Sequence, residues 1–256
     1  MTDHGQLARI LDDAARAARA VPQFGEDMTV ADAYRIQDLL IGHRLRRGET
    51  LVGVKMGFTS RAKMAQMGVS DLIWGRLTDA MRLEDGGSVA PGRFIHPRVE
   101  PEIAFLLKAP LAGAVTPLEA GQAVAAVAPA LEIIDSRFDR FKFSLADVIA
   151  DNASSSAFVA GAWRAMPADL SNLGMVMSLN GRARQIGSTG AILGDPLRSL
   201  AAAARLAGES GLMLHPGQIV LAGAGTGAEP FAPGDHAAVE IEGLGRAGIR
   251  MQGGQS

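Results

Sequence analysis

Three glutamates inside apolar, strand-like segments constrain this chain more than any other feature. Glu100 and Glu102 lie in residues 98–105, and Glu132 lies in residues 129–134. Side chains two residues apart on a strand point to the same face, so Glu100 and Glu102 would lie side by side, whereas a helix would send them to nearly opposite sides. Glu132 is flanked by residues that favour burial. Because an unpaired buried carboxylate is strongly destabilising, Glu132 is expected to have a cationic partner.

Three converging carboxylates predict a site for a hard divalent cation, Mg²⁺ or Mn²⁺, held by oxygen ligands and bound water. The chain contains no cysteine, which excludes disulfides, thiolate nucleophiles and metal sites built on cysteine. The competing interpretation is a solvated strand edge at Glu100 and Glu102, together with a salt-bridged glutamate, Glu132, in the core. The expected burial of Glu132 favours the metal site.

Four motifs, taken in their order along the chain, carry a resemblance to known proteins. They are G-V-K-M-G-F-T-S at 53–60, R-V-E-P-E-I-A-F at 98–105, P-A-L-E-I-I-D-S-R at 129–137 and I-A-D-N-A-S-S at 149–155. Together they resemble the 2-oxopent-4-enoate hydratase and 4-oxalocrotonate decarboxylase family of the fumarylacetoacetate hydrolase superfamily. The resemblance runs from about Met28 to Gly245.

The resemblance implies an α+β fold, mixed and strand-rich as in fumarylacetoacetate hydrolase-like proteins, with an N-terminal helical lobe. We expect the lobe to span residues 1–50 and the catalytic domain to span residues 51–256. Residues 6–20 have the apolar spacing of an amphipathic helix. Thr29 is placed to cap a second helix, which Gly48 ends.

Within the second part, periodicity and turn residues predict the individual elements. Asn180-Gly181 is a strong hairpin signal after an apolar run. The alanine-rich stretch 197–208 predicts a well-formed helix, and a further helix is expected at residues 117–127. Short apolar runs predict strands at residues 51–56, 103–107, 175–179, 218–222 and 237–241.

The same resemblance assigns roles to individual side chains. Glu100, Glu102 and Glu132 would bind the metal ion. Lys55 is the lysine of the family's G-x-K-x-G motif and would be catalytic, holding a substrate carboxylate or assisting proton transfer. From its apolar neighbours alone, Lys55 could equally extend its ammonium group into solvent.

Two polar segments complete the expected site. Asp151 and Asn152 are expected as active-site contacts or as residues that support them, although these residue types also favour a helix cap or an Asx-turn. The hydroxyl groups of Thr59, Ser60 and Ser154 are expected to bind the substrate. The first two of these could instead cap a helix that begins directly after them.

Residues 55–69 and 136–155 are most similar to the decarboxylase branch. We therefore expect decarboxylation of 2-oxo-3-hexenedioate to 2-hydroxypenta-2,4-dienoate, a step in meta-cleavage catabolism of aromatic compounds. A divalent ion would stabilise negative charge on the 2-oxo oxygen as carbon dioxide leaves the remote end, so no organic cofactor is needed. The first alternative is hydration of 2-hydroxypenta-2,4-dienoate, which could use the same metal because both reactions pass through related enolates.

Two further alternatives are weaker. Hydrolysis of a carbon–carbon bond in a β-diketo acid is disfavoured because many superfamily hydrolases place an aspartate where Glu132 stands. A non-catalytic partner subunit is disfavoured because Lys55 and the glutamates are retained. Physical reasoning does not separate decarboxylase from hydratase, since the choice depends on whether the pocket holds a second carboxylate and excludes nucleophilic water.

Residues 223–228, G-A-G-T-G-A, fit a loose dinucleotide-binding pattern. That motif requires a helix directly after the glycines, and Pro230 and Pro233 block one here. We interpret the segment as a glycine-rich loop that lines the pocket.

Composition predicts a soluble cytoplasmic enzyme. The formal net charge of −2 gives no electrostatic reason to bind nucleic acid or an anionic membrane. Asp3, Asp12 and Asp13 argue against a signal peptide, and no stretch approaches ~20 uninterrupted apolar residues. We expect a small 2-oxo acid as substrate, a homo-oligomeric protein, and a capacity to associate with a partner hydratase.

Overall fold

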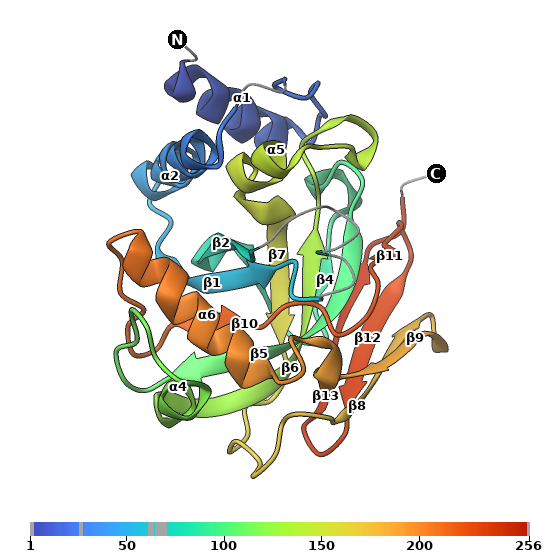
Figure 1. The fold of residues 1–256 in the computed structure, drawn as a ribbon. Helices are drawn as coiled ribbons and strands as arrows, with labels where there is room; N and C mark the ends of the chain where they lie inside the picture. Colours follow the sequence, from blue (N-terminus) through green and yellow to red (C-terminus); the bar gives the residue numbers. More distant parts are fainter. Residues whose placement is uncertain (1–2, 26–27, 61–63, 65–70, 255–256) are drawn as a thin grey trace.

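Two β-sheets form the body of the structure, a group of helices lies at the end that holds the N-terminus, and a further helix, at residues 196–209, lies beside the larger sheet (Figure 1). The computed structural model describes residues 3–25, 28–60, 64 and 71–254. The predicted mixture of strands and helices, with helices first in the chain, is confirmed. The principal helices are α1 (His4–Ala17), α2 (Val30–Arg46), α4 (Pro117–Gln122), α5 (Leu145–Ala150) and α6 (Pro196–Glu209).

The larger sheet positions the site. Its strands run in the order β2-β1-β10-β5-β6-β7-β3, and β11 pairs with β5. β10 lies in the middle, parallel to β1 and antiparallel to β5. The strands are β1 (Leu51–Gly57), β2 (Ile73–Thr78), β3 (Arg82–Leu83), β5 (Arg98–Leu107), β6 (Val124–Ile134), β7 (Ser155–Ala160), β10 (Ile219–Leu221) and β11 (Glu229–Pro230).

Strand β6 corrects one prediction. The helix expected at residues 117–127 ends at Gln122, and the chain enters β6 at Val124. β6 pairs with β5 along one edge and with β7 along the other, and its successive residues 127–133 are all buried, so both of its faces are covered there. A strand in that position is apolar along its whole length, and periodicity does not distinguish such a run from a buried helix.

The smaller sheet packs against the larger one, and residues of both sheets share one apolar core. Its order is β4-β13-β12-β8-β9, and Asn180-Gly181 forms the predicted hairpin between β8 and β9. The predicted strands at 51–56, 175–179 and 237–241 are confirmed to within one residue. The strands are β4 (Ser88–Val89), β8 (Gly174–Leu179), β9 (Arg182–Ser188), β12 (His236–Ile241) and β13 (Gly245–Met251).

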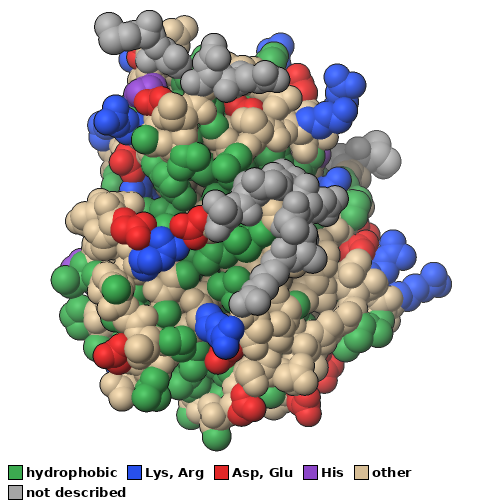
Figure 2. All heavy atoms as spheres, in the orientation of Figure 1, with side chains coloured by type: hydrophobic (Ala, Val, Ile, Leu, Met, Phe, Trp, Pro, Cys, Tyr) green, Lys and Arg blue, Asp and Glu red, His purple; other side chains and the backbone are tan. Residues whose placement is uncertain are grey.

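Helix α2 packs on α1 and on α5, and the three helices share a second apolar cluster (Figure 1). The Thr29 side chain accepts a hydrogen bond from the Asp32 backbone N–H at 3.1 Å, which confirms the predicted cap of α2. Figure 2 shows acidic and basic side chains interspersed over the face in view. Among the described residues, no helix combines the length and apolar character needed to cross a membrane.

Candidate metal and substrate site

The three predicted glutamates converge. Glu100 on β5 lies directly opposite Glu132 on β6, and Glu102 follows on the same face of β5. Each offers a carboxylate oxygen, and these three atoms all lie within 4.8 Å of one another. Glu102 and Glu132 are fully buried, while Glu100 is 9% exposed. The solvated strand edge considered from the sequence is therefore excluded.

Lys55 lies at the same place and is buried rather than extended into solvent. Its Nζ atom is 2.9 Å from Oε2 of Glu132 and donates a hydrogen bond to the Ala153 carbonyl at 3.0 Å. This ion pair supplies the cationic partner expected for Glu132. Because β10 and β5 lie between β1 and β6, the contact also requires the sheet to curl around the cluster.

Three carboxylates and the ammonium group of Lys55 lie together at this place. We call Glu100, Glu102, Glu132 and Lys55 the carboxylate cluster. Burial, and then the neighbouring Glu132, raise the pKa of Glu102 well above its ordinary value. Burial alone would lower the pKa of Lys55, but the three carboxylates outweigh it and raise that pKa. The lysine is therefore a persistent cation.

Two carboxylate oxygens of the cluster have unused hydrogen-bonding capacity. Oε2 of Glu102 accepts a hydrogen bond from the Gly223 backbone N–H at 2.8 Å, but Oε1 has no partner among the described residues. Oε1 of Glu132 is equally buried and unpartnered within the described chain. Buried polar atoms are normally hydrogen-bonded, so these two oxygens indicate a missing ligand.

Gly223 belongs to the glycine-rich loop, and its backbone has a φ of 101°. A Cβ atom at this position would lie 2.2 Å from Oγ1 of Thr59, so only glycine fits. The predicted contact of this loop with the pocket is confirmed, because Ala224 lines the cavity described next.

A cavity of about 180 Å³ opens beside the cluster. Its polar lining comes from Lys55, Glu100 and the predicted substrate-binding residues Thr59, Ser60 and Ser154. Oγ of Ser154 is buried and has no hydrogen-bond partner among the described atoms. The rest of the lining is mainly apolar and includes Phe58, Ile73, Ile134, Phe141, Phe143 and Val148.

Sequence reasoning missed the aromatic side of this cavity. Phe58 and Phe141 both have positive φ angles, a conformation that is uncommon for bulky residues. Phe141 and Phe143 lie in the segment F-D-R-F-K-F, and this density of aromatic residues in a polar loop was the available signal. The helix expected directly after Ser60 falls mostly within 61–63 and 65–70, outside the described residues.

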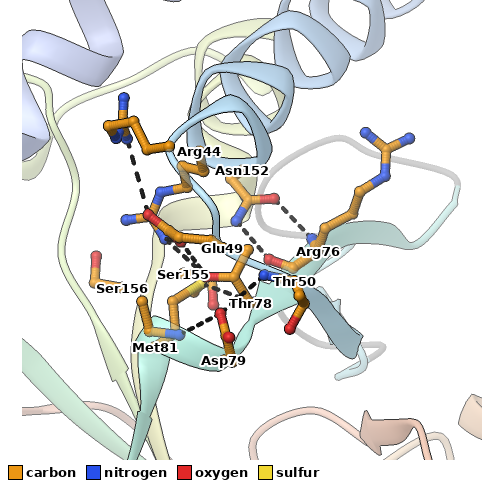
Figure 3. Close-up of polar contacts among 12 residues, drawn as sticks. Arg44, Glu49, Thr50, Arg76, Thr78, Asp79, Met81, Asn152, Ser155 and Ser156 are labelled. Carbon is orange, nitrogen blue, oxygen red and sulfur yellow. Dashed lines mark hydrogen bonds and ion pairs between the residues drawn. The ribbon is translucent and has the colours of Figure 1, made fainter.

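Asn152 and Asp151 do not line the cavity. The Asn152 carboxamide pairs with both backbone groups of Arg76 on β2, at 2.7 and 2.9 Å (Figure 3). Residues 152–154 have φ angles of 52°, 52° and 57°, a strained left-handed turn that this pairing holds in place. The turn presents the Ala153 carbonyl to Lys55. The predicted contact is thus a supporting one.

Asp151 is fully buried and forms an ion pair with Arg137, accepting hydrogen bonds from its Nε and from its backbone N–H. Burial raises the pKa of Asp151 to about 6, against the opposing effect of Arg137. Its carboxylate is occupied by Arg137, so Asp151 fixes the chain directly before the turn at residues 152–154 and does not contact the cavity.

Further ion pairs join this region to the N-terminal helices. Arg47 binds Asp12 at 2.5 Å, and Arg44 lies 3.5 Å from Glu49. Thr78 donates a hydrogen bond to Glu49 at 2.6 Å (Figure 3). Three arginines thus face three carboxylates, and we call this set the junction cluster: Asp12, Arg44, Arg47, Glu49, Arg137 and Asp151.

Comparison with known proteins agrees with this geometry. Residues 50–252 match the fumarylacetoacetate hydrolase C-terminal family. The chain is 58% identical to a 4-oxalocrotonate decarboxylase from Pseudomonas sp. over 97% of this chain and 98% of the relative. It is 37% identical to a 2-hydroxyhexa-2,4-dienoate hydratase from Comamonas testosteroni over 94% of each chain.

A solved structure extends the likeness to three dimensions. The 4-oxalocrotonate decarboxylase from Pseudomonas putida G7, complexed with magnesium and adipate, superimposes with a TM-score of 0.94 and 39% sequence identity. The match covers 98% of each chain. The strand-rich fold with N-terminal helices, predicted from the sequence, is thereby confirmed.

Proposed function

This chain belongs to the fumarylacetoacetate hydrolase family, and we propose that it is a metal-dependent decarboxylase of 2-oxo-3-hexenedioate, with 2-hydroxypenta-2,4-dienoate and carbon dioxide as products. The observation that carries the proposal is the carboxylate cluster, which lies beside a cavity with one polar and one apolar side. Identity of 58% to a 4-oxalocrotonate decarboxylase over nearly the whole chain supports this reaction.

Glu100, Glu102 and Glu132 would hold a divalent ion, Mg²⁺ or Mn²⁺. The residues fit such an ion in two respects. Three of its carboxylate oxygens lie within 4.8 Å of one another, and it contains buried carboxylate oxygens with no partner among the described residues. Carboxylate oxygens are the ligands that both ions favour. When bound, the ion supplies positive charge to substrate oxygens on which negative charge develops.

Lys55 would act on the substrate directly. Its ammonium group is fixed by Glu132 and by the Ala153 carbonyl, so it enters the reaction already oriented. We propose that Nζ of Lys55 holds a proton beside the substrate oxygen that becomes the 2-hydroxyl group. Oγ of Ser154 and the hydroxyl groups of Thr59 and Ser60 would donate hydrogen bonds to the substrate.

The aromatic side of the cavity favours decarboxylation over hydration. Phe58, Phe141 and Phe143 form an apolar surface where the carbon chain of the substrate would lie. Hydration requires an ordered water molecule at that chain, whereas loss of carbon dioxide requires no water and is favoured in apolar surroundings. The 37% identity to a hydratase over 94% of the chain keeps hydration as the second candidate.

Purified protein with Mg²⁺ and each substrate separately tests the choice. Release of carbon dioxide from 2-oxo-3-hexenedioate, abolished by a chelator and restored by Mg²⁺, is the expected result. Efficient formation of 4-hydroxy-2-oxopentanoate from 2-hydroxypenta-2,4-dienoate, without carbon dioxide release from the diacid, would replace the proposal with the hydratase.

We also propose a helical lobe at residues 1–50 and a catalytic domain at residues 51–256, and the family match that begins at residue 50 supports this division. A homo-oligomer in the cytoplasm, able to associate with a partner hydratase, completes the proposal. Ile186 is 77% exposed on the edge strand β9, which supports contact with another chain. Light scattering of the purified protein, alone and with the hydratase, would test the assembly.

A further inference from the structure

We infer that Arg98, which stacks on a ring that lines the cavity, binds the second carboxylate of a dicarboxylic substrate. The inference rests on the function proposed above and adds the residue that would distinguish a diacid from a monoacid. Arg98 is the first residue of β5, two positions before Glu100 and four before Glu102.

The register of β5 and β6 places Arg98 on the same face as the glutamates. Arg98 lies directly opposite Ile134, just as Glu100 lies directly opposite Glu132. Residues opposite one another, and residues two apart along one strand, share a face of the sheet. Ile134 lines the cavity, so this shared face is the one turned toward it. Arg98, Glu100 and Glu102 occupy alternate positions of β5, and Arg98 lies at the solvent-exposed end of this series whereas the glutamates are buried.

The guanidinium group of Arg98 rests on an aromatic ring instead of an acid. Its Cζ atom lies 4.9 Å from the centre of the Phe141 ring, and Phe141 lines the cavity. Within the described parts of the chain, no carboxylate forms an ion pair with Arg98. A guanidinium group that stacks on a ring keeps its N–H edge available, and that edge matches a carboxylate in two parallel hydrogen bonds.

The spacing suits a six-carbon diacid. Two residues along a strand advance by roughly 6.7 Å. The terminal carbons of an extended six-carbon diacid are separated by roughly 6 Å, the span of five carbon–carbon bonds. The backbone positions of Glu100 and Arg98 are therefore separated by about the length of such a diacid, so a substrate with one carboxylate beside the carboxylate cluster can extend its other carboxylate toward Arg98.

Arg98 would contribute to binding and not to the chemical step. A carboxylate that leaves as carbon dioxide loses its negative charge, so an ion pair with Arg98 stabilises the bound substrate more than the transition state. Removing the arginine should raise KM for the diacid and leave kcat unchanged or slightly higher. A structural role would instead lower the melting temperature, and a role in catalysis would lower kcat.

Calorimetric titration of the Mg²⁺-loaded protein tests this without relying on turnover. The two ligands are adipate, a saturated six-carbon diacid, and hexanoate, its monoacid counterpart. In Arg98→Gln we expect the Kd for adipate to rise roughly 10- to 100-fold, the scale of a hydrogen bond to a charged group, with no change for hexanoate. Arg98→Lys should restore part of the loss, because it keeps the charge but not the planar edge.

Arg140→Gln is the matched control. Arg140 is also an exposed arginine and directly precedes Phe141, so this variant removes the same charge beside the ring on which Arg98 stacks. Only long-range electrostatics should change, and we expect less than about a threefold effect on adipate at physiological salt. The melting temperature of each variant identifies any loss of folded protein.

Several outcomes would overturn the inference. They are equal adipate affinity in the wild type and Arg98→Gln, equal losses in Arg98→Gln and Arg140→Gln, an equal loss of hexanoate binding, or a wild type with no preference for adipate. The proposed reaction is tested by a different measurement, the release of carbon dioxide from the diacid. A wild type that releases none, but loses adipate selectively in Arg98→Gln, would refute the reaction and leave the role of Arg98 standing.

Discussion

Two groups of charged side chains, the first partly exposed and the second buried, differ in how fully their polar atoms are satisfied. In the junction cluster three arginines face three carboxylates, and Arg137 and Asp151 satisfy one another through several hydrogen bonds. In the carboxylate cluster three glutamates lie beside Lys55, and one oxygen each of Glu102 and Glu132 has no partner in the described structure. Since buried charge is tolerated only when it is compensated, the first group reads as structural and the second as a ligand site.

The largest effect should follow from removing one ligand. In Glu102→Gln we expect carbon dioxide release with Mg²⁺ to fall roughly 10²- to 10³-fold, the scale of losing one preorganised electrostatic group. The melting temperature of the metal-free protein should stay constant or rise, because the variant removes an uncompensated buried charge. Wild-type activity and metal affinity in this variant would exclude Glu102 from the site.

Lys55→Met should damage both activity and stability. Loss of the ammonium group leaves the Glu132 carboxylate buried without its partner, which we expect to lower the free energy of unfolding of the metal-free protein by about 3–5 kcal/mol. Turnover per folded molecule should fall roughly 10²-fold, as for loss of a proton-transfer group. Urea denaturation and initial rates measure the two effects. Adding Glu132→Gln to Lys55→Met should recover stability but not turnover, and recovery of neither would contradict the pairing.

Arg137→Met tests the other side of the comparison. Breaking the buried pair with Asp151 should also lower the free energy of unfolding by about 3–5 kcal/mol. The increase in melting temperature that Mg²⁺ produces should match the wild type, whereas Glu102→Gln should show little increase. If Mg²⁺ stabilised Arg137→Met no better than Glu102→Gln, the assignment of a structural role to the junction cluster and of ion binding to the carboxylate cluster would be wrong.

The pH dependence of metal binding should be the smallest of these effects. The pKa of Glu102 is raised, so without metal its contribution to stability is present at low pH and is lost as the pH rises through that pKa. Mg²⁺ requires the ionised carboxylate and should bind more tightly as the pH rises, by at most about tenfold per pH unit for each proton released. Calorimetry at several pH values, in buffers of different ionisation enthalpy, counts the protons. Affinity independent of pH would show that Glu102 is already ionised.

The sequence was sufficient to predict the carboxylate cluster because its signals are local. Alternation on a strand places Glu100 beside Glu102, and the apolar neighbours of Glu132 and Lys55 predict their burial. The motif resemblance added the pairing of these segments. Together they predicted the metal-ligand set, and the structure brings these residues together as expected.

What could not be predicted depends on contacts between distant segments. Asp151 and Asn152 are polar residues in a site motif, yet their partners are Arg137 and the backbone of Arg76, which no local pattern specifies. The helix ends at Gln122 because the residues that follow pair, as strand β6, with β5 and β7. In each case tertiary pairing decided between local conformations of similar free energy.

The position of β10 has a consequence for synthesis of the protein. This strand, Ile219–Leu221, fills the gap between β1 and β5, and the next turn donates the Gly223 N–H to Glu102. Chains leave the ribosome N-terminus first, so β1, β5 and β6 emerge long before the strand that joins them. A nascent chain that ends before residue 223 carries all three glutamates and the lysine but cannot assemble their site. The carboxylate cluster is thus among the last features of the molecule to form, although its four residues are made within the first 132.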